Sequence, residues 1–162
     1  MTNIKWLYLF GFVLIAGLTL ILMPSDEKKI FKMIDELAVF CSTSNDESAL
    51  ETLKKAAGIA KLCSYPCYIT IESFKIDKSF SQKEISDHVL LMRRRLPETK
   101  FSFHDTAVNV SDNRAEVITT LKLDGRSANG RFVDAYEIDI NMKKENGDWF
   151  FSSFKVVEFM EK

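Results

Sequence analysis

The chain has 162 residues and carries 22 Lys and Arg against 23 Asp and Glu, a formal net charge of -1 at pH 7. This balance argues against a nucleic-acid-binding protein, because such proteins cluster Lys and Arg to neutralise phosphates. With two histidines, three cysteines and no His-x-His or Glu-x-x-His spacing, the sequence predicts no metal site, and no motif indicates a cofactor.

An uncharged apolar segment, residues 6–23 (WLYLFGFVLIAGLTLILM), lies near the N-terminus. A helix rises 1.5 Å per residue, so this segment is long enough for a hydrocarbon core of roughly 30 Å. We expect residues 1–24 to form a transmembrane anchor. A cleaved secretory signal is the alternative, but signals have shorter apolar regions and end at a small-x-small site, which the residues before Ser25 do not provide.

The orientation of this anchor depends on two opposing signals. Lys5 precedes the apolar segment and Lys28, Lys29 and Lys32 follow it, which by the positive-inside rule favours a cytoplasmic domain. Long domains, however, are translocated largely regardless of charge, and a short basic stub before one span resembles a bacterial signal-anchor. We therefore predict a single-pass protein of the bacterial inner membrane whose domain faces the periplasm or the exterior.

Three helices are expected after the anchor, because apolar residues recur there every three or four positions. Polar caps mark where two of them begin: Ser25 for the first, and a capping box of Ser81 with Glu84 for the third. Pro97 ends the third helix. The predicted ranges are residues 26–41, about 49–62 and 81–96.

Five strands are expected in the remainder. The first, residues 67–76, is rich in β-branched and aromatic residues. Hairpin-type loops rich in Asp, Asn and Gly separate the other four, which are residues 100–110, 114–123, 131–143 and 148–159. Consecutive hairpins give an antiparallel meander. The sequence therefore predicts one α+β domain, residues 25–162, with three helices packed on an antiparallel sheet.

The order of these elements resembles that of the nuclear transport factor 2-like superfamily, which includes SnoaL-like and ketosteroid-isomerase-like domains. The ending NGDWFFSSFK, residues 146–155, is similar to the G-x-W-x-I-x-x-F last strand common there. The resemblance implies a cone-like, cystatin-like topology in which a curved sheet wraps the helices and leaves a cavity at its open end. Members use this cavity for catalysis or for protein docking, so the fold alone selects no function.

Four residues are candidates for lining that cavity. Period-two alternation places Asp134 and Tyr136 on one face of their strand with Ile138, and this face is expected to meet the helices. An acid among apolar groups is the setting that raises a carboxyl pKa, and His104 and Tyr68 are expected near the same space. One hypothesis is therefore a small-molecule-binding or isomerase-like enzyme that uses the cavity.

The leading hypothesis is a membrane-anchored, non-catalytic interaction or scaffold domain. No motif matches the catalytic residues of isomerase-like members, so no catalytic residue is assigned. A cell-envelope assembly component of this kind would bind a protein partner or form a homodimer. Aromatic residues occur on both faces of the last strand, and one set must be covered. The candidate interface is Phe150, Phe154 and Val156, opposite Trp149, Phe151, Val157 and Phe159.

The cysteines allow two interpretations. Cys63 and Cys67 flank a Pro turn and are candidates for a disulfide if the domain faces an oxidising compartment, which leaves Cys41 as a buried thiol on the first helix. In the alternative, all three are small core residues.

Three consecutive arginines, Arg93 to Arg95, end the third helix, where cations complement the helix dipole. The alternative is a site for phosphate or for anionic lipid headgroups, which requires the cytoplasmic orientation.

Overall fold

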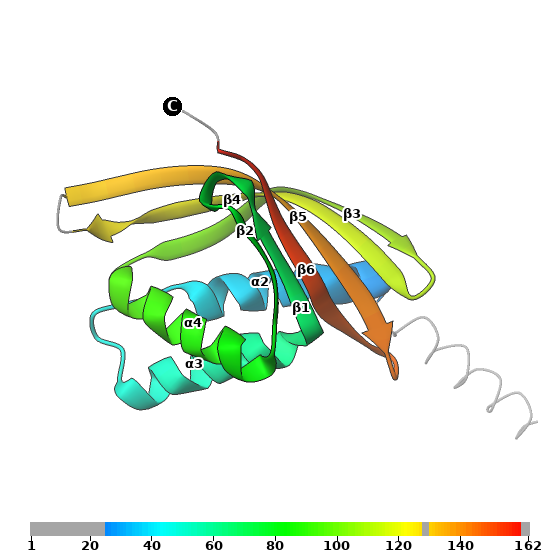
Figure 1. The fold of residues 1–162 in the computed structure, drawn as a ribbon, viewed down its shortest axis with the longest axis horizontal. Coiled ribbons are helices and arrows are strands. Elements are labelled where there is room, and N and C mark those ends of the chain that lie inside the picture. Colours follow the sequence, from blue (N-terminus) through cyan, green and yellow to red (C-terminus); the bar gives the residue numbers. More distant parts are fainter. Residues whose placement is uncertain (1–24, 128–129, 160–162) are drawn as a thin grey trace, which may run out of the picture.

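Three helices cover one face of a curved six-stranded sheet (Figure 1). The computed structural model describes residues 25–127 and 130–159. The helices are α2 (Asp26–Cys41), α3 (Ala49–Leu62) and α4 (Gln82–Arg95), and η1 (Glu72–Phe74) is a 3-10 turn. The strands are β1 (Cys63–Ile71), β2 (Ile76–Phe80), β3 (Lys100–Ser111), β4 (Arg114–Ser127), β5 (Gly130–Glu145) and β6 (Asp148–Phe159). The predicted α+β organisation is confirmed.

Serine side chains cap the three described helices. Ser25 Oγ and Ser48 Oγ each accept a hydrogen bond from a backbone N–H in the first turn of α2 and α3. The capping box of α4 is complete, since Ser81 Oγ accepts the Glu84 N–H and Glu84 Oε2 accepts the Ser81 N–H at 2.8 Å. Such caps typically contribute about 1 kcal/mol each, which explains why the helix starts could be predicted from sequence.

The sheet has the strand order β2-β1-β6-β5-β4-β3. β1 runs parallel to β6, whereas all other neighbours are antiparallel. The prediction of a purely antiparallel sheet is therefore wrong at this one pairing. The reason is that α4 and four strands separate β1 from β6 along the chain, so no hairpin fixes their relative direction.

The single strand predicted over residues 67–76 is wrong in its bounds, because this part of the chain forms two strands. β1 already begins at Cys63, directly after α3. After η1, Lys75 adopts a left-handed conformation with φ of 53° and turns the chain back into β2. β1 and β2 then pair antiparallel, which places β2 at one edge of the sheet.

Two β-bulges in β6 decide which of its side chains face the helices. The pairing of β6 with β5 shifts register twice. As a result Phe151 and Phe154, three residues apart, both lie on the helix-facing side, opposite Met142 and Ile140, which are buried. The simple alternation predicted for this strand is therefore wrong. The helix-facing residues of β6 in or against the core are Trp149, Phe151, Phe154 and Val156.

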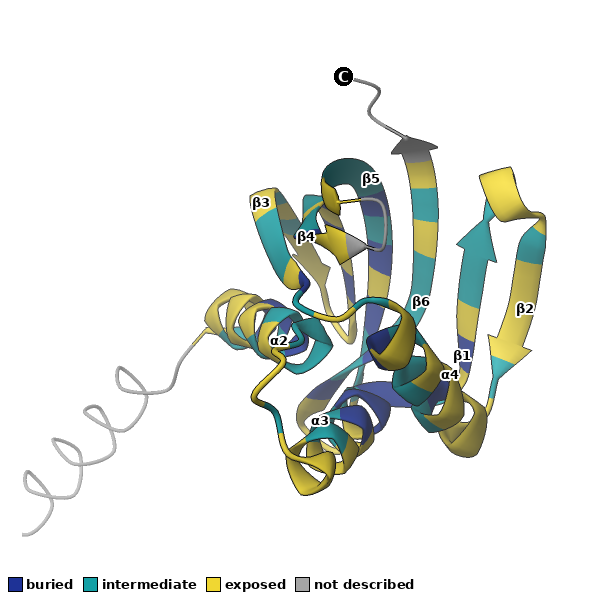
Figure 2. Cartoon of the chain, turned by 90° about the vertical axis from the view of Figure 1, so that its left-hand side faces the viewer, coloured by how far each residue is buried: buried dark blue, intermediate teal, exposed yellow. Residues whose placement is uncertain are grey.

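The core occupies the half of the sheet near α3 (Figure 2). On β5, Ile138, Ile140 and Met142 are buried, but no described residue between the start of β5 and Ile138 is. We call the end of the sheet where β4 joins β5 the open end. The opposite end, with the β3–β4 and β5–β6 turns, is the closed end. Helix α2 begins at the closed end, where Lys144 Nζ lies 2.7 Å from Asp26 Oδ2.

The predicted anchor, residues 6–23, lies outside the described residues. Within residues 25–127 and 130–159, no helix is both long and apolar enough to cross a membrane. The anchor therefore stays a prediction.

Gly125 on β4 is expected to resist substitution by Ala. A Cβ there would lie 3.0 Å from Thr99 Cβ and 3.1 Å from Phe132 Cε1, and closer still to Thr99 Oγ1, while Thr99 is fully buried. Overpacking of this kind costs about 1–3 kcal/mol. We expect Gly125→Ala to lower the free energy of unfolding in urea by that amount, and a smaller cost in a Thr99→Ala background. Unchanged stability of the single variant would contradict this packing.

Candidate functional site

The helix-facing side of β5 carries Asp134 and Tyr136 toward the open end. Tyr136 pairs with Leu121 and Asp134 pairs with Leu123, so these four side chains lie on the same side of the sheet as the buried Ile138. Tyr136 and Leu121 also pack against the core. As the alternation predicts, an acid and a phenol therefore follow directly on the apolar core, both half-buried.

The environment of Tyr136 favours its protonated form. Burial raises the pKa of the Tyr136 phenol, and the negative charge of Asp134 raises it further. The phenol is therefore protonated at neutral pH, and the side chain of Asp134 lies on the same face. A protonated phenol can donate a hydrogen bond to a bound oxygen, and a carboxylate can accept one.

His104 does not share this space, so its assignment to the cavity is wrong. It pairs with Thr120 and lies on the outer face, the side of the sheet away from the helices, with Nε2 3.0 Å from Ser102 Oγ. A bulge follows at Asp105, whose φ is 52°, and returns Thr106 to the inner side. The alternation of inward Phe101 and Phe103 around it was the signal that His104 points outward.

Tyr68 also lies on the outer face and is wrongly assigned to the cavity. It pairs with Ser153, which in turn pairs with Asn141, and its side chain is 54% exposed. Its neighbour Ile69 points inward and packs against the core. The sheet itself therefore separates Tyr68 from Asp134.

The three interface candidates divide between the two faces of β6. Phe154 and Val156 pack against the core, because the bulges turn them toward the helices and away from the outer face. Phe150 pairs with Lys143 on the outer face and is half-buried. Of the three, Phe150 is the residue that a partner can contact.

The structure holds the three cysteines as free thiols. Cys63 and Cys67 belong to the buried core, and Cys41 is half-buried at the end of α2. Burial raises the pKa of Cys41 to about 12, so this thiol stays protonated. In the described parts of the chain, no group of three or more His, Cys, Asp or Glu side chains is placed to hold a metal ion.

A buried ion pair joins α4 to the segment between α2 and α3. Arg93 bonds the Glu47 carboxylate and also donates to the backbone oxygens of Phe40 and Ser42. Its side chain is 2% exposed and that of Glu47 is 6% exposed. Lys55 Nζ lies 2.6 Å from the other Glu47 oxygen. Arg93 thus lies in the last turn of α4, as predicted, but its guanidinium is buried in this ion pair and not exposed to solvent.

Sequence reasoning missed this ion pair although a signal was present. Ile85, Val89 and Arg93 are spaced by four residues, so Arg93 continues the apolar stripe of α4. Burial alone would raise the pKa of Glu47, but the hydrogen bonds from Lys55 and Arg93 outweigh it and lower the pKa overall. Glu47 therefore remains charged in the folded protein at neutral pH.

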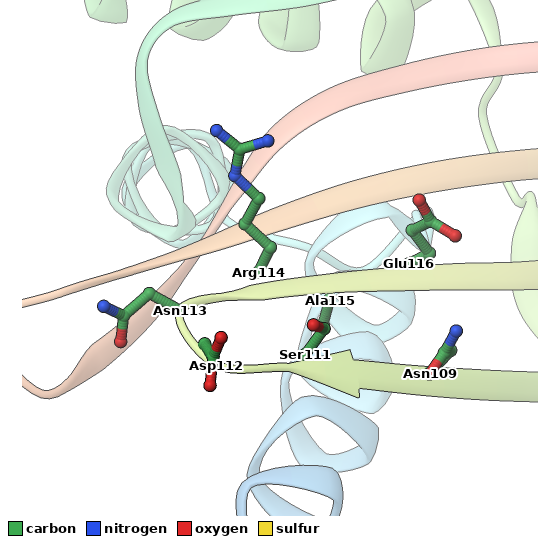
Figure 3. A pocket seen from close by; sticks show the side chains of 7 residues that line it. All are labelled: Asn109, Ser111, Asp112, Asn113, Arg114, Ala115 and Glu116. Atoms are coloured by element: carbon green, nitrogen blue, oxygen red, sulfur yellow. The ribbon is translucent and has the colours of Figure 1, made fainter.

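A polar hollow of about 400 Å³ lies at the closed end, on the β3–β4 hairpin (Figure 3). Side chains of both charge signs border it: Arg114 and Glu116 come from β4, and Asp112 from the turn. This hollow and the Asp134–Tyr136 pair thus lie at opposite ends of the sheet. Its complete lining is Asn109, Ser111, Asp112, Asn113, Arg114, Ala115 and Glu116.

No protein-family model matches the sequence, and neither does any curated protein. Solved structures, in contrast, share the fold. A nuclear transport factor 2-like protein with a cystatin-like fold from Novosphingobium aromaticivorans superposes with a TM-score of 0.63 at 11% identity, over 88% of this chain and 85% of that chain.

Two further solved structures share this fold but are named for different functions. A candidate calcium/calmodulin-dependent protein kinase II association domain from Xanthomonas campestris gives a TM-score of 0.62 at 11% identity, covering 83% of this chain and 89% of that one. A candidate scytalone dehydratase from Novosphingobium aromaticivorans gives 0.63 at 11% identity, covering 85% and 87%. The domain therefore has a nuclear transport factor 2-like, cystatin-like α+β fold, and these likenesses assign it no activity.

Substituting Arg93 is expected to destabilise the domain strongly. Arg93→Met leaves a buried carboxylate with one partner fewer and frees two backbone oxygens, which costs about 3 kcal/mol. The adjacent Arg94 is exposed, so Arg94→Met should change the free energy of unfolding by less than about 0.5 kcal/mol. Urea unfolding at pH 7 measures both, and equal effects would contradict the assignment.

The same pair predicts a pH dependence. The folded-state pKa of Glu47 lies below its ordinary value of 4.5, so its contribution to stability is present above about pH 4.5 and is lost as the pH falls through the lowered folded pKa. The gap in stability between the wild type and Arg93→Met should therefore narrow in acid. A gap that stays constant from pH 7 to pH 3 would contradict an ionic role for Glu47.

Proposed function

We propose that the protein is a membrane-anchored, non-catalytic interaction domain of the nuclear transport factor 2-like class. Residues 1–24 form the anchor and residues 25–162 the domain, which faces the periplasm or exterior of the bacterial inner membrane. It serves as a scaffold component of a cell-envelope assembly and binds a protein partner or a second copy of itself.

One observation carries the non-catalytic assignment. The groups that sequence reasoning combined into a proton-transfer site stand on opposite sides of the sheet, His104 and Tyr68 outside and Asp134 and Tyr136 inside. General acid–base catalysis requires its groups within hydrogen-bond reach of one substrate. The other histidine, His88, is exposed on α4 and bonds the Glu84 backbone oxygen at 2.7 Å.

The outer face supplies the surface for a partner. Phe150 and Tyr68 lie there on the neighbouring strands β6 and β1, and Lys143 pairs with Phe150. Aromatic side chains beside a cation are typical of the residues that dominate protein interfaces. Ile118 on β4 also lies on this face, where it is 53% exposed, so the apolar part of the surface extends beyond Phe150 and Tyr68.

The direction of the domain follows from where α2 begins. Asp26 contacts Lys144 at the closed end, so an anchor directly before α2 places this end at the membrane. Ten residues of β5 separate Lys144 from Asp134, which corresponds to about 30 Å at roughly 3.3 Å per residue. The open end therefore points away from the bilayer, which argues against ligands taken from the membrane surface.

Phe150→Glu is expected to abolish self-association or partner binding without unfolding the domain, because it places a charge in an outward aromatic contact. Native mass spectrometry of the full-length protein extracted in mild detergent measures the assembly. Leu50→Glu, at a position on α3 that is 62% exposed and away from the outer face, is the matched control and should leave the mass unchanged. A monomeric, partner-free wild type would overturn the proposal.

A second candidate function rests on the adjacent Asp134 and Tyr136 at the open end. In this proposal the domain binds a small molecule, or acts on it as isomerase-like enzymes do, with Asp134 moving a proton and Tyr136 donating a hydrogen bond to an oxygen that gains charge. The candidate scytalone dehydratase of the same fold supports this use of the concave face.

Asp134→Asn separates the two functions. If the open end binds enolisable ketones, the substitution should remove binding or turnover and change the melting temperature little, because the side chain is half-exposed. A thermal-shift screen of such ketones on the wild type and the variant provides the measurement. A more stable variant, with no ketone bound by either protein, would eliminate the enzyme candidate.

A further inference from the structure

We infer that Cys63 and Cys67 are the two halves of a disulfide, which closes a bulge of β1 where this strand pairs with β6. The structure holds the reduced form. The pairing of the two cysteines follows from the fold. Only the formation of the bond in the cell rests on the proposed function, because it requires the domain to face an oxidising compartment.

The strand register brings the two residues together. Cys63 pairs with Phe151 and Tyr68 with Ser153, so β1 advances five residues while β6 advances two. Two strand positions span about 7 Å, which is far less than five extended residues would need. The segment between the cysteines is therefore looped out. Cys67 comes one residue before Tyr68, so the register places it close to Cys63 beside β6. A disulfide requires Cα atoms about 4.4–6.8 Å apart, which this looped segment allows.

The side chains converge on the same part of the core. Cys63 is 5% exposed and Cys67 is fully buried, and both belong to the cluster that contains Phe151. The neighbouring Cys67 thiol raises the pKa of Cys63, and burial adds to this effect. The looped residue Ser64 is held in place as well, since its Oγ donates to the Phe151 oxygen at 3.2 Å.

Cys41 is the third thiol of this region and the competing partner. The pKa of Cys63 is raised mainly by Cys67 and by burial, and Cys41 has the smallest effect on it. Cys41 lies at the end of α2, and burial keeps its thiol protonated, so it does not take part in the disulfide.

The reaction is thiol–disulfide exchange with an oxidised dithiol protein or with oxidised glutathione. One cysteine thiolate attacks the external disulfide, forms a mixed disulfide and releases one external thiol. The second cysteine then attacks the mixed disulfide and releases the other external thiol. Two thiols of this chain thereby lose two protons and two electrons, and one external disulfide gains them. Because both sulfurs are buried, the exchange requires local opening of β1 or takes place before the core closes.

A disulfide between Cys63 and Cys67 can be detected by mass spectrometry within a single tryptic peptide. Trypsin cuts after Lys61 and Lys75, so one peptide, residues 62–75, contains both cysteines, and Cys41 lies in the peptide of residues 33–54. We would incubate the full-length protein in detergent with oxidised glutathione, denature it, block free thiols with N-ethylmaleimide and digest it without reductant. The expected result is a 62–75 peptide that is two hydrogens lighter and unblocked, with Cys41 blocked.

Several outcomes would overturn the inference. A 62–75 peptide that carries two maleimide groups shows that the pair does not close, and a cross-link between peptides 33–54 and 62–75 shows that Cys41 is the true partner. The Cys41→Ser variant should keep the bond and Cys63→Ser should lose it. The oxidised wild type should also unfold at higher urea concentration than the reduced form, a difference that Cys63→Ser should not show.

A second measurement tests the proposed outward orientation of the domain separately from the pairing of Cys63 with Cys67. Protein blocked with N-ethylmaleimide inside cells should already carry the bond if the domain faces an oxidising compartment. A bond that forms with glutathione but is missing in cells supports the pairing and overturns the outward orientation.

Discussion

A strand in the middle of a wrapped sheet must present more apolar surface to the helices than strict alternation allows, and in β6 two bulges meet this requirement. They turn Phe151 and Phe154 to the same side although three residues separate them. The outer face correspondingly receives small polar residues, such as Ser153, whose Oγ accepts the Asn141 side-chain N–H at 2.9 Å. Core packing, the curvature of the sheet and the limited apolar area outside all depend on these two irregularities.

The helices and hairpins of this domain could be predicted because their signals are local. Serine caps and turn residues act over three or four positions, and α2 and α4 begin where the predicted caps Ser25 and Ser81 indicated. The parallel pairing of β1 with β6 has no such signal, since it depends on the whole order of the sheet. Bulges were also missed, because the letters of β6 fit a regular strand equally well.

The candidate site shows the same difference between local features, which could be predicted, and features that depend on several strands, which could not. Alternation within β5 correctly predicted that Asp134 and Tyr136 share the helix-facing side, because β5 carries no bulge on its side of the pairing with β4. Combining them with His104 and Tyr68 requires knowledge of which face each strand turns inward, and the apolar neighbours Phe103 and Ile69 carry that signal. Arg93 was missed for a different reason, because arginine is rarely buried unless a partner such as Glu47 is present.

The hydrogen bond from Ser64 to Phe151 joins residues 87 positions apart, and it marks the seam at which β6 enters between β1 and β5. The strand that completes the middle of the sheet thus comes last in the chain among the described strands. Until it arrives, β1 and β5 present open edges, and the two halves of the sheet are linked only through the helices. Long-range pairings of this kind form slowly and leave such edges open to other chains. Folding of the domain is therefore governed by the supply of its C-terminal strand, and any helper that shields unpaired strands during synthesis would act at this seam.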